Sequence, residues 1–220
     1  MSEKRIVWGI GTSRTIRAHW ALIELGLPYS IEVVRTRTPD TETEEFKSVN
    51  PRQKIPVLED GEIRIGESAA IVTYLAENYR QGSTILIPED KALRAKYFEW
   101  MSFITMELDA TSLYVLRRHW SLPEIYGDSP VANKASEEYF QRMITAASKM
   151  IDDKKPYLLG NSFTGVDILL TTTLKWAVDY NQKLPAIFND YLLRLNARPQ
   201  YIEAQRVNNQ TRQDRWMAYG

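Results

Sequence analysis

The stretch KIPVLEDGEIRIGES, residues 54–68, predicts a β-hairpin that is followed at once by a helix. Strand-forming residues come before the dipeptide Asp60-Gly61, which supplies the positive φ of a tight two-residue turn. After the turn, Ile63 and Ile65 alternate with polar residues, as in a return strand with one buried face. Gly66-Glu67-Ser68 then ends the sheet, and the apolar residues that follow have the spacing of an amphipathic helix.

Pro56 interrupts the first strand of this hairpin. Proline has no N–H for a strand ladder, so it is unusual inside a central strand. One explanation is a trans proline at the start of the strand, the commoner isomer of any X-Pro bond. The other is a cis Ile55-Pro56 bond, which bends the chain and leaves the backbone N–H and C=O of Ile55 free for a ligand. The residues alone leave both explanations open.

A βαβ unit precedes the hairpin. Ile6–Trp8 and Ile31–Val34 are expected to be strands, and Arg14–Leu25 between them a helix that Thr12 or Ser13 can cap. Such a unit implies a parallel strand pair and a right-handed crossover. The first 80 residues or so therefore predict a small α/β domain.

The remainder of the chain has helical patterns. Lys91–Trp120 predicts a long helix with one apolar face, made by Leu93, Tyr97, Trp100, Ile104 and Leu108. A second helical pattern runs from about Asn133 to Asp152, and Thr164 with Asp167 forms a capping box before a third, from Val166 to about Tyr180. We therefore expect two domains, residues 1–81 and residues 89–220, of which the second is helical. The tail, residues 205–220, has no predicted position.

The composition excludes several classes of function. The 28 basic and 28 acidic residues balance, so no overall field favours nucleic acid or an anionic membrane as a partner. The chain has no cysteine, and His19 and His119 are its only histidines, so we expect no disulfide, no thiol nucleophile and no metal site. There is no apolar run of about 20 residues and no signal peptide, which predicts a cytoplasmic protein.

The hairpin and the helix after it resemble the glutathione-binding half of the cytosolic glutathione transferases. Ile-Pro-Val-Leu, then Asp-Gly, then Glu-Ser-Ala-Ala-Ile follow one another with the order and spacing of that family. Ser13-Arg14-x-x-Arg17 is similar to a form found in some bacterial and fungal serine-type members. The resemblance implies a thioredoxin-like α/β N-terminal domain, an all-α helical-bundle C-terminal domain, glutathione as co-substrate, and a homodimer.

The resemblance also implies which residues bind glutathione. The Ile55-Pro56 bond would be cis, with the backbone of Ile55 pairing with the cysteinyl part of glutathione. Glu67 would meet the γ-glutamyl ammonium, and Ser68 the γ-glutamyl carboxylate. Ser13 is preferred as the hydroxyl that hydrogen-bonds the sulfur. Thr12 is the alternative, because other serine-type classes place the hydroxyl one residue earlier relative to the arginine.

The glycyl carboxylate of glutathione needs a cation. Lys54 is expected to supply it, ahead of Arg52, Lys47 and Arg14. The chain departs from the family here, because Gln53 stands where glycine is frequent.

The expected function is a glutathione S-transferase that acts in detoxification on a small hydrophobic electrophile. The alternatives are a glutathione-dependent isomerase or peroxidase, and a non-catalytic binding or scaffold protein that keeps the fold without turnover. The electrophile is expected beside the first long helix, whose candidate contacts are Trp100, Phe103, Ile104, Glu107, Tyr114 and Arg118.

Overall fold

The computed structural model describes residues 5–80, 84 and 86–210, and these residues form two compact units. The first unit holds the chain up to Leu86 together with the described residues from Asn196 onward, and the second is Ile87–Leu195. Residues 81–83 and 85, near the predicted domain boundary, and residues 211–220 of the predicted tail lie outside the described residues.

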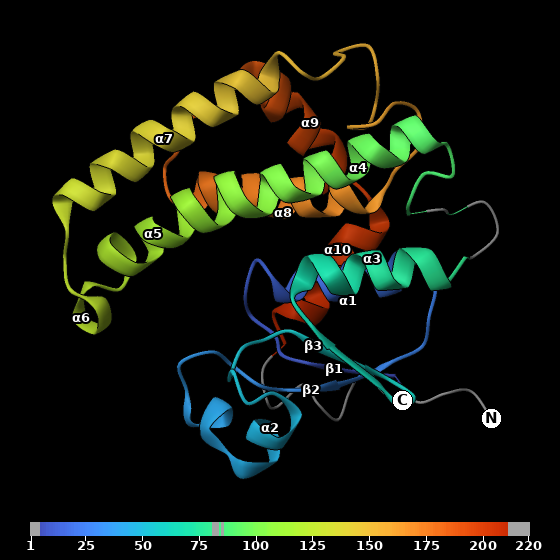
Figure 1. Ribbon diagram of the computed structural model, residues 1–220, viewed down its shortest axis with the longest axis vertical. Helices are drawn as coiled ribbons and strands as arrows, with labels where there is room; N and C mark the ends of the chain where they lie inside the picture. The colour runs from blue at the N-terminus through green and yellow to red at the C-terminus, as the bar shows by residue number, and fades with distance from the viewer. Residues whose placement is uncertain (1–4, 81–83, 85, 211–220) are drawn as a thin grey trace. The chain divides into compact units, whose positions relative to one another are not determined.

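A four-stranded mixed sheet with the strand order β2-β1-β3-β4 is the centre of the first unit (Figure 1). Its strands are β1 (Arg5–Trp8), β2 (Ser30–Glu32), β3 (Val57–Asp60) and β4 (Ile63–Gly66). β1 pairs with β2 in parallel and with β3 antiparallel, and β3 pairs antiparallel with β4. Both the βαβ unit and the hairpin are therefore confirmed.

The turn of the hairpin lies one residue later than predicted. Asp60 still pairs with Ile63, so the two loop residues are Gly61 and Glu62. Gly61 has a φ of 60°, a conformation that glycine adopts without a Cβ clash.

Helices cover both faces of this sheet. They are α1 (Thr15–Glu24), the 3₁₀ turn η1 (Pro39–Glu42), α2 (Glu44–Val49), α3 (Ser68–Asn78) and α10 (Pro199–Asn208). Trp8 and Val57 pack against Phe46 of α2. Val7 and Leu58, their neighbours along the strands, are fully buried and point to the opposite face. That face carries α1 and α3 (Figure 1).

The last described helix, α10, packs on α1 of the first unit. The guanidinium of Arg198 donates two hydrogen bonds to the buried carboxylate of Glu24, at 3.0 and 2.8 Å. Trp20 donates to the same carboxylate at 2.8 Å and stacks on Tyr201. These contacts join residues after Asn196 to the first unit, whereas the predicted boundary places all of residues 89–220 in the helical domain.

The second unit consists of helices. They are α4 (Lys91–Phe103), η2 (Ile104–Leu113), α5 (Tyr114–Leu116), η3 (Arg117–Ser121), α6 (Pro123–Tyr126), α7 (Pro130–Ser148), α8 (Gly165–Asp179) and α9 (Ala186–Asn196), where η2 and η3 are π-helical stretches. The three predicted helices are present. On the first, Tyr97, Trp100, Ile104 and Leu108 are buried as predicted, but Leu93 is 43% exposed, so its placement on the buried face is wrong. None of the described helices is long and apolar enough to cross a membrane.

The predicted capping box at the start of α8 is confirmed. The Asp167 carboxylate accepts the backbone N–H and the hydroxyl of Thr164, at 2.8 and 2.9 Å. It also accepts the N–H of Leu158 at 2.8 Å and the hydroxyl of Tyr191 at 2.7 Å. One fully buried carboxylate thus joins the start of α8 to α9 and to the loop that precedes α8.

Candidate glutathione site

Three segments of the chain leave the sheet of the first unit at the same edge. The register places Trp8 of β1, Val57 of β3 and Gly66 of β4 side by side. Because β3 runs antiparallel to both neighbours, the loop after Trp8, the residues before Val57 and the turn after Gly66 all lie beyond this edge. The strand pairing therefore brings together the loop that carries Ser13, the Ile55-Pro56 pair and the Glu67-Ser68 pair.

The Ile55-Pro56 peptide bond is cis, as predicted. In the described part of the chain, neither the N–H nor the C=O of Ile55 has a protein hydrogen-bond partner. The loop after β1 lies directly against this residue: a Cβ on Gly9, whose φ is 118°, would be 2.6 Å from the Cβ of Ile55. A backbone with one free donor and one free acceptor is therefore exposed to a ligand next to that loop.

The two predicted hydroxyls have different environments. The Thr12 side chain satisfies backbone donors just before and at the start of α1, because its Oγ1 accepts the N–H of Thr15 at 3.0 Å and that of Arg14 at 3.3 Å. Its carbonyl also accepts the N–H of Ile16 at 3.3 Å, the first helical hydrogen bond. The half-buried Ser13 side chain has no hydrogen-bond partner among the described residues. Of the two, Ser13 has the hydroxyl that is available to a ligand.

Ser68 lies at the first position of α3 and is buried. Arg17, which is 1% exposed, donates from Nη1 to Ser68 Oγ at 3.1 Å. An arginine can only donate, so Ser68 Oγ accepts this bond and keeps its own proton for another acceptor. The sequence pattern indicates Arg17 only as part of a motif and does not predict this contact, since a lone arginine in a helix normally indicates a solvent-exposed position.

The N-terminus of α3 favours a bound carboxylate. The first N–H groups of a helix have no intrahelical partner, and no side chain caps α3. These groups carry the positive partial charge of the helix end. Together with the Ser68 hydroxyl and the buried Arg17, they form a positive region at the sheet edge.

Glu67 and the candidate cations differ in whether they have ion-pair partners. The exposed carboxylate of Glu67 pairs with Arg52 at 3.0 Å, and Lys47 pairs with Glu44 at 2.8 Å. Lys54 has no ion-pair partner within the described ranges. Its carbonyl accepts a hydrogen bond from the Asn50 side chain at 2.7 Å, which fixes the loop before Ile55.

Gln53, the departure from the family pattern, has a φ of 54°. This is the left-handed conformation that glycine adopts most easily. The loop thus has the backbone conformation that glycine favours, although glutamine stands at this position.

His19 lies beneath the loop after β1 and is fully buried. Its Nε2 donates to the carbonyl of Gly9 at 3.0 Å, and its Nδ1 is 3.2 Å from the hydroxyl of Tyr29. Burial lowers the pKa of His19 to about 4, although the bond to Gly9 partly opposes the change. The neutral imidazole therefore holds Gly9 in place against Ile55.

We expect this histidine to make folding pH-dependent. The unfolded chain takes up the proton near pH 6.5 and the folded chain near pH 4, so the unfolded state binds more protons between these values. The free energy of unfolding should therefore fall by about 3 kcal/mol as the pH is lowered through this range. In His19→Gln, which keeps a donor for Gly9 but does not titrate, this part of the slope should vanish. Urea unfolding of both proteins at a series of pH values measures the difference, and equal slopes would contradict the prediction.

Four of the six candidate electrophile contacts in the helical unit fall into two groups. Trp100 and Ile104 are buried in the core of that unit. The guanidinium of Arg118 instead lies over the rings of Tyr114 and Tyr126, at 5.3 and 5.1 Å from their centroids.

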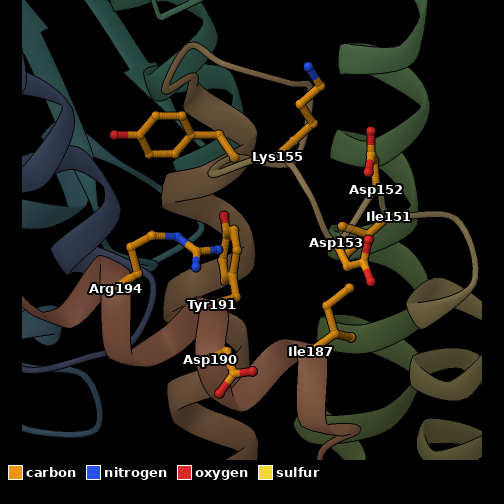
Figure 2. Close-up of a pocket in the computed structure, with 9 residues that line it drawn as sticks. Ile151, Asp152, Asp153, Lys155, Ile187, Asp190, Tyr191 and Arg194 are labelled. Atoms are coloured by element: carbon orange, nitrogen blue, oxygen red, sulfur yellow. The ribbon is translucent and has the colours of Figure 1, made fainter.

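A pocket of about 280 Å³ lies elsewhere in the helical unit (Figure 2). Four of its residues come from α9, and the others lie in the segment after α7; they are Ile187, Asp190, Tyr191 and Arg194, and Ile151, Asp152, Asp153, Lys155 and Tyr157. Two of its polar groups serve the fold: Tyr191 donates to Asp167, and Arg194 donates to the carbonyl of Pro156 at 3.1 Å. None of the predicted site residues lines it.

The sequence of the first unit matches a known protein family. Residues 13–78 match the profile described as glutathione S-transferase, N-terminal domain. This stretch is therefore similar to the N-terminal domain of glutathione S-transferases. The matched range begins at Ser13 and includes the cis bond and Ser68.

Relatives extend the similarity beyond this range. "Glutathione S-transferase F14" of Arabidopsis thaliana is 27% identical over 74% of this chain, and the alignment spans 62% of that protein. "Glutathione S-transferase APIC" of Nicotiana tabacum is 26% identical, with 87% of this chain and 92% of that protein covered. Among solved structures, the theta class glutathione S-transferase of Xanthomonas axonopodis pv. citri, crystallised with glutathione bound, has a TM-score of 0.76 and 25% identity. That comparison covers 95% of this chain and 99% of the other, which confirms the predicted thioredoxin-like domain with a helical C-terminal region.

Proposed function

We propose that this protein is a serine-type glutathione transferase, in which the Ser13 hydroxyl stabilises the glutathione thiolate for attack on a small apolar electrophile. One observation carries the proposal. The strand register brings the unpartnered Ser13 hydroxyl, the free backbone of Ile55 and the start of α3 to a single edge of the sheet. The relatives named as glutathione S-transferases, and the relative crystallised with glutathione, support the choice of ligand.

The chemistry required of the site is stabilisation of an anion. A free thiol has a pKa of about 8.5, so most of it is protonated at neutral pH, and only the thiolate is a strong nucleophile. A hydrogen bond to a charged group contributes about 1.5–3 kcal/mol, which corresponds to a fall of about one to two units in the pKa of the thiol. The Ser13 hydroxyl can donate this bond, because no group among the described residues uses it.

The rest of the tripeptide is proposed to bind along the same edge. The backbone of Ile55 pairs with the cysteinyl residue. The γ-glutamyl carboxylate binds the Ser68 hydroxyl and the N–H groups of α3. The γ-glutamyl ammonium binds Glu67, whose carboxylate pairs with Arg52 in the structure. Lys54 supplies the cation for the glycyl carboxylate. These contacts hold the sulfur next to Ser13, so proximity adds to the effect of the lowered thiol pKa.

Substitution of Ser13 tests the proposal. In the wild type, mixing with glutathione should produce the ultraviolet absorbance of the thiolate. Ser13→Ala should raise the pKa of the bound thiol by about one to two units and lower kcat about 10- to 100-fold at neutral pH. The dissociation constant for glutathione should change little, because the contacts at Ile55 and Ser68 remain.

Thr12→Val is the matched comparison for this test. It removes the neighbouring hydroxyl, and its main expected effect is a loss of about 1 kcal/mol of stability through the helix cap. Thiolate absorbance that persists in Ser13→Ala but disappears in Thr12→Val would transfer the role to Thr12. Wild-type protein that neither binds glutathione nor ionises it would exclude the transferase function. Sedimentation would test the homodimer that we propose alongside it.

A further inference from the structure

We infer that Asn208, at the end of α10, is a positioning residue of the thiolate site. This inference rests on the function proposed above, because it concerns the geometry of the Ser13 hydroxyl. Asn208 is 6% exposed and lies in the first unit, although it is separated from the Ser13 loop by more than 190 residues.

Asn208 makes four hydrogen bonds to the loop that carries Ser13. Its Oδ1 accepts the N–H of Gly11 at 3.1 Å and the hydroxyl of Thr15 at 2.6 Å. Its Nδ2 donates to the carbonyl of Thr12 at 3.2 Å. Its backbone carbonyl also accepts the N–H of Gly11 at 2.9 Å. The loop is thus bound on both sides of Ser13.

These contacts limit where the hydroxyl protons of Thr12 and Thr15 can point. The Thr15 hydroxyl lies 2.6 Å from Asn208 Oδ1 and 3.0 Å from the Thr12 carbonyl; neither oxygen can donate, so the Thr15 proton is used by these acceptors, of which Asn208 is the nearer. The contact of 3.0 Å between the hydroxyls of Thr12 and Thr15 must then use the Thr12 proton. The Thr12 hydroxyl therefore has no proton left to donate to a ligand, whereas the Ser13 hydroxyl keeps its proton free. Asn208, the nearer acceptor of the Thr15 proton, therefore favours Ser13 over Thr12 and holds the residues on both sides of Ser13.

The end of α10 is anchored well enough to act as a fixed support. The start of the helix is held by the pair between Arg198 and the buried Glu24. Just beyond its end, the carbonyl of Gln210 accepts a hydrogen bond from Arg35 at 2.9 Å. Because α10 is held at both ends, Asn208 can keep the loop in one conformation while the thiolate forms.

The test is the pKa of bound glutathione in Asn208→Ala, measured from the thiolate absorbance at saturating glutathione. We expect this pKa to rise by about one unit, so that kcat at neutral pH falls about tenfold while KM for glutathione changes little. Asn209→Ala is the matched control. Asn209 is the same residue type and next in sequence, but it is exposed, and its side chain makes no hydrogen bond to the described residues of the loop, so this variant should keep the wild-type pKa.

Two further measurements keep the inference open to refutation. Thr15→Val removes the hydroxyl that Asn208 binds, and it should produce a similar rise in the pKa of bound glutathione. This variant tests the inference even if Asn208→Ala does not fold. Thr15→Ser, which restores the hydroxyl, should return the pKa to the wild-type value. A lowered melting temperature with an unchanged thiol pKa in these variants would overturn the inference but leave the transferase function intact. A wild type that forms no thiolate would instead reject the transferase function, and the inference with it.

Discussion

Gly9→Ala is expected to destabilise the first unit by about 4 kcal/mol and to weaken glutathione binding at least about tenfold. The new Cβ would lie 2.6 Å from the Cβ of Ile55 and 2.9 Å from its Cγ2. The φ of Gly9, 118°, is also one that an alanine rarely adopts. Backbone strain of this kind costs about 1–3 kcal/mol and overpacking about the same again. Because Ile55 must move to relieve the contact, its free backbone groups move with it.

The matched control lies two residues away. Gly11 also has a positive φ, of 80°, but a Cβ there would meet no atom within 4 Å. Gly11→Ala therefore keeps the backbone strain without the clash, and should cost about 1–2 kcal/mol and leave most of the binding. Denaturant unfolding and calorimetric titration of both variants separate the two effects. Equal losses in both would show that the contact between Gly9 and Ile55 does not matter.

The fold and half of the site could be predicted because their signals are local. The hairpin, the helix starts and the capping box each depend on residues within a few positions of one another. The cis bond at Pro56 could not be predicted from proline chemistry, which left both isomers open. Only the resemblance of the whole stretch to a known family favoured the cis isomer, which the structure has. Glu67 and Ser68 followed from the same stretch.

The contacts that arise from distant parts of the chain could not be predicted. Asn208 falls in a polar segment that has no periodicity of its own, and its partners are about 200 residues away. Arg17 is buried although arginines are normally exposed, and nothing in a helical pattern indicates that it will meet Ser68. The choice between Thr12 and Ser13 has the same origin, since both can cap a helix. It depends on the hydrogen bonds that Asn208 makes to Thr15 and to the backbone of the loop.

Asp167→Ala is expected to destabilise the helical unit by about 4 kcal/mol. The carboxylate accepts hydrogen bonds from Leu158, Thr164 and Tyr191, so its removal leaves several buried donors without an acceptor. Each unsatisfied buried donor costs about 1–3 kcal/mol. Burial raises the pKa of Asp167 and the hydrogen bonds lower it, so the gain from removing a buried charge offsets only part of this loss.

Two variants separate the role of this carboxylate from that of its charge. Asp167→Asn keeps an acceptor for Leu158 and Tyr191 but turns an N–H toward the backbone N–H of Thr164, and should cost about 1–2 kcal/mol. Asp179→Ala changes the same residue type at the other end of α8, where the carboxylate is exposed and pairs with Lys175, and should cost less than about 0.5 kcal/mol. Guanidinium unfolding followed by circular dichroism should rank wild type and Asp179→Ala together, Asp167→Asn below them, and Asp167→Ala last. If Asp167→Ala matched Asp179→Ala, the buried donors would have found other acceptors, and Asp167 would not be what joins α8 to α9.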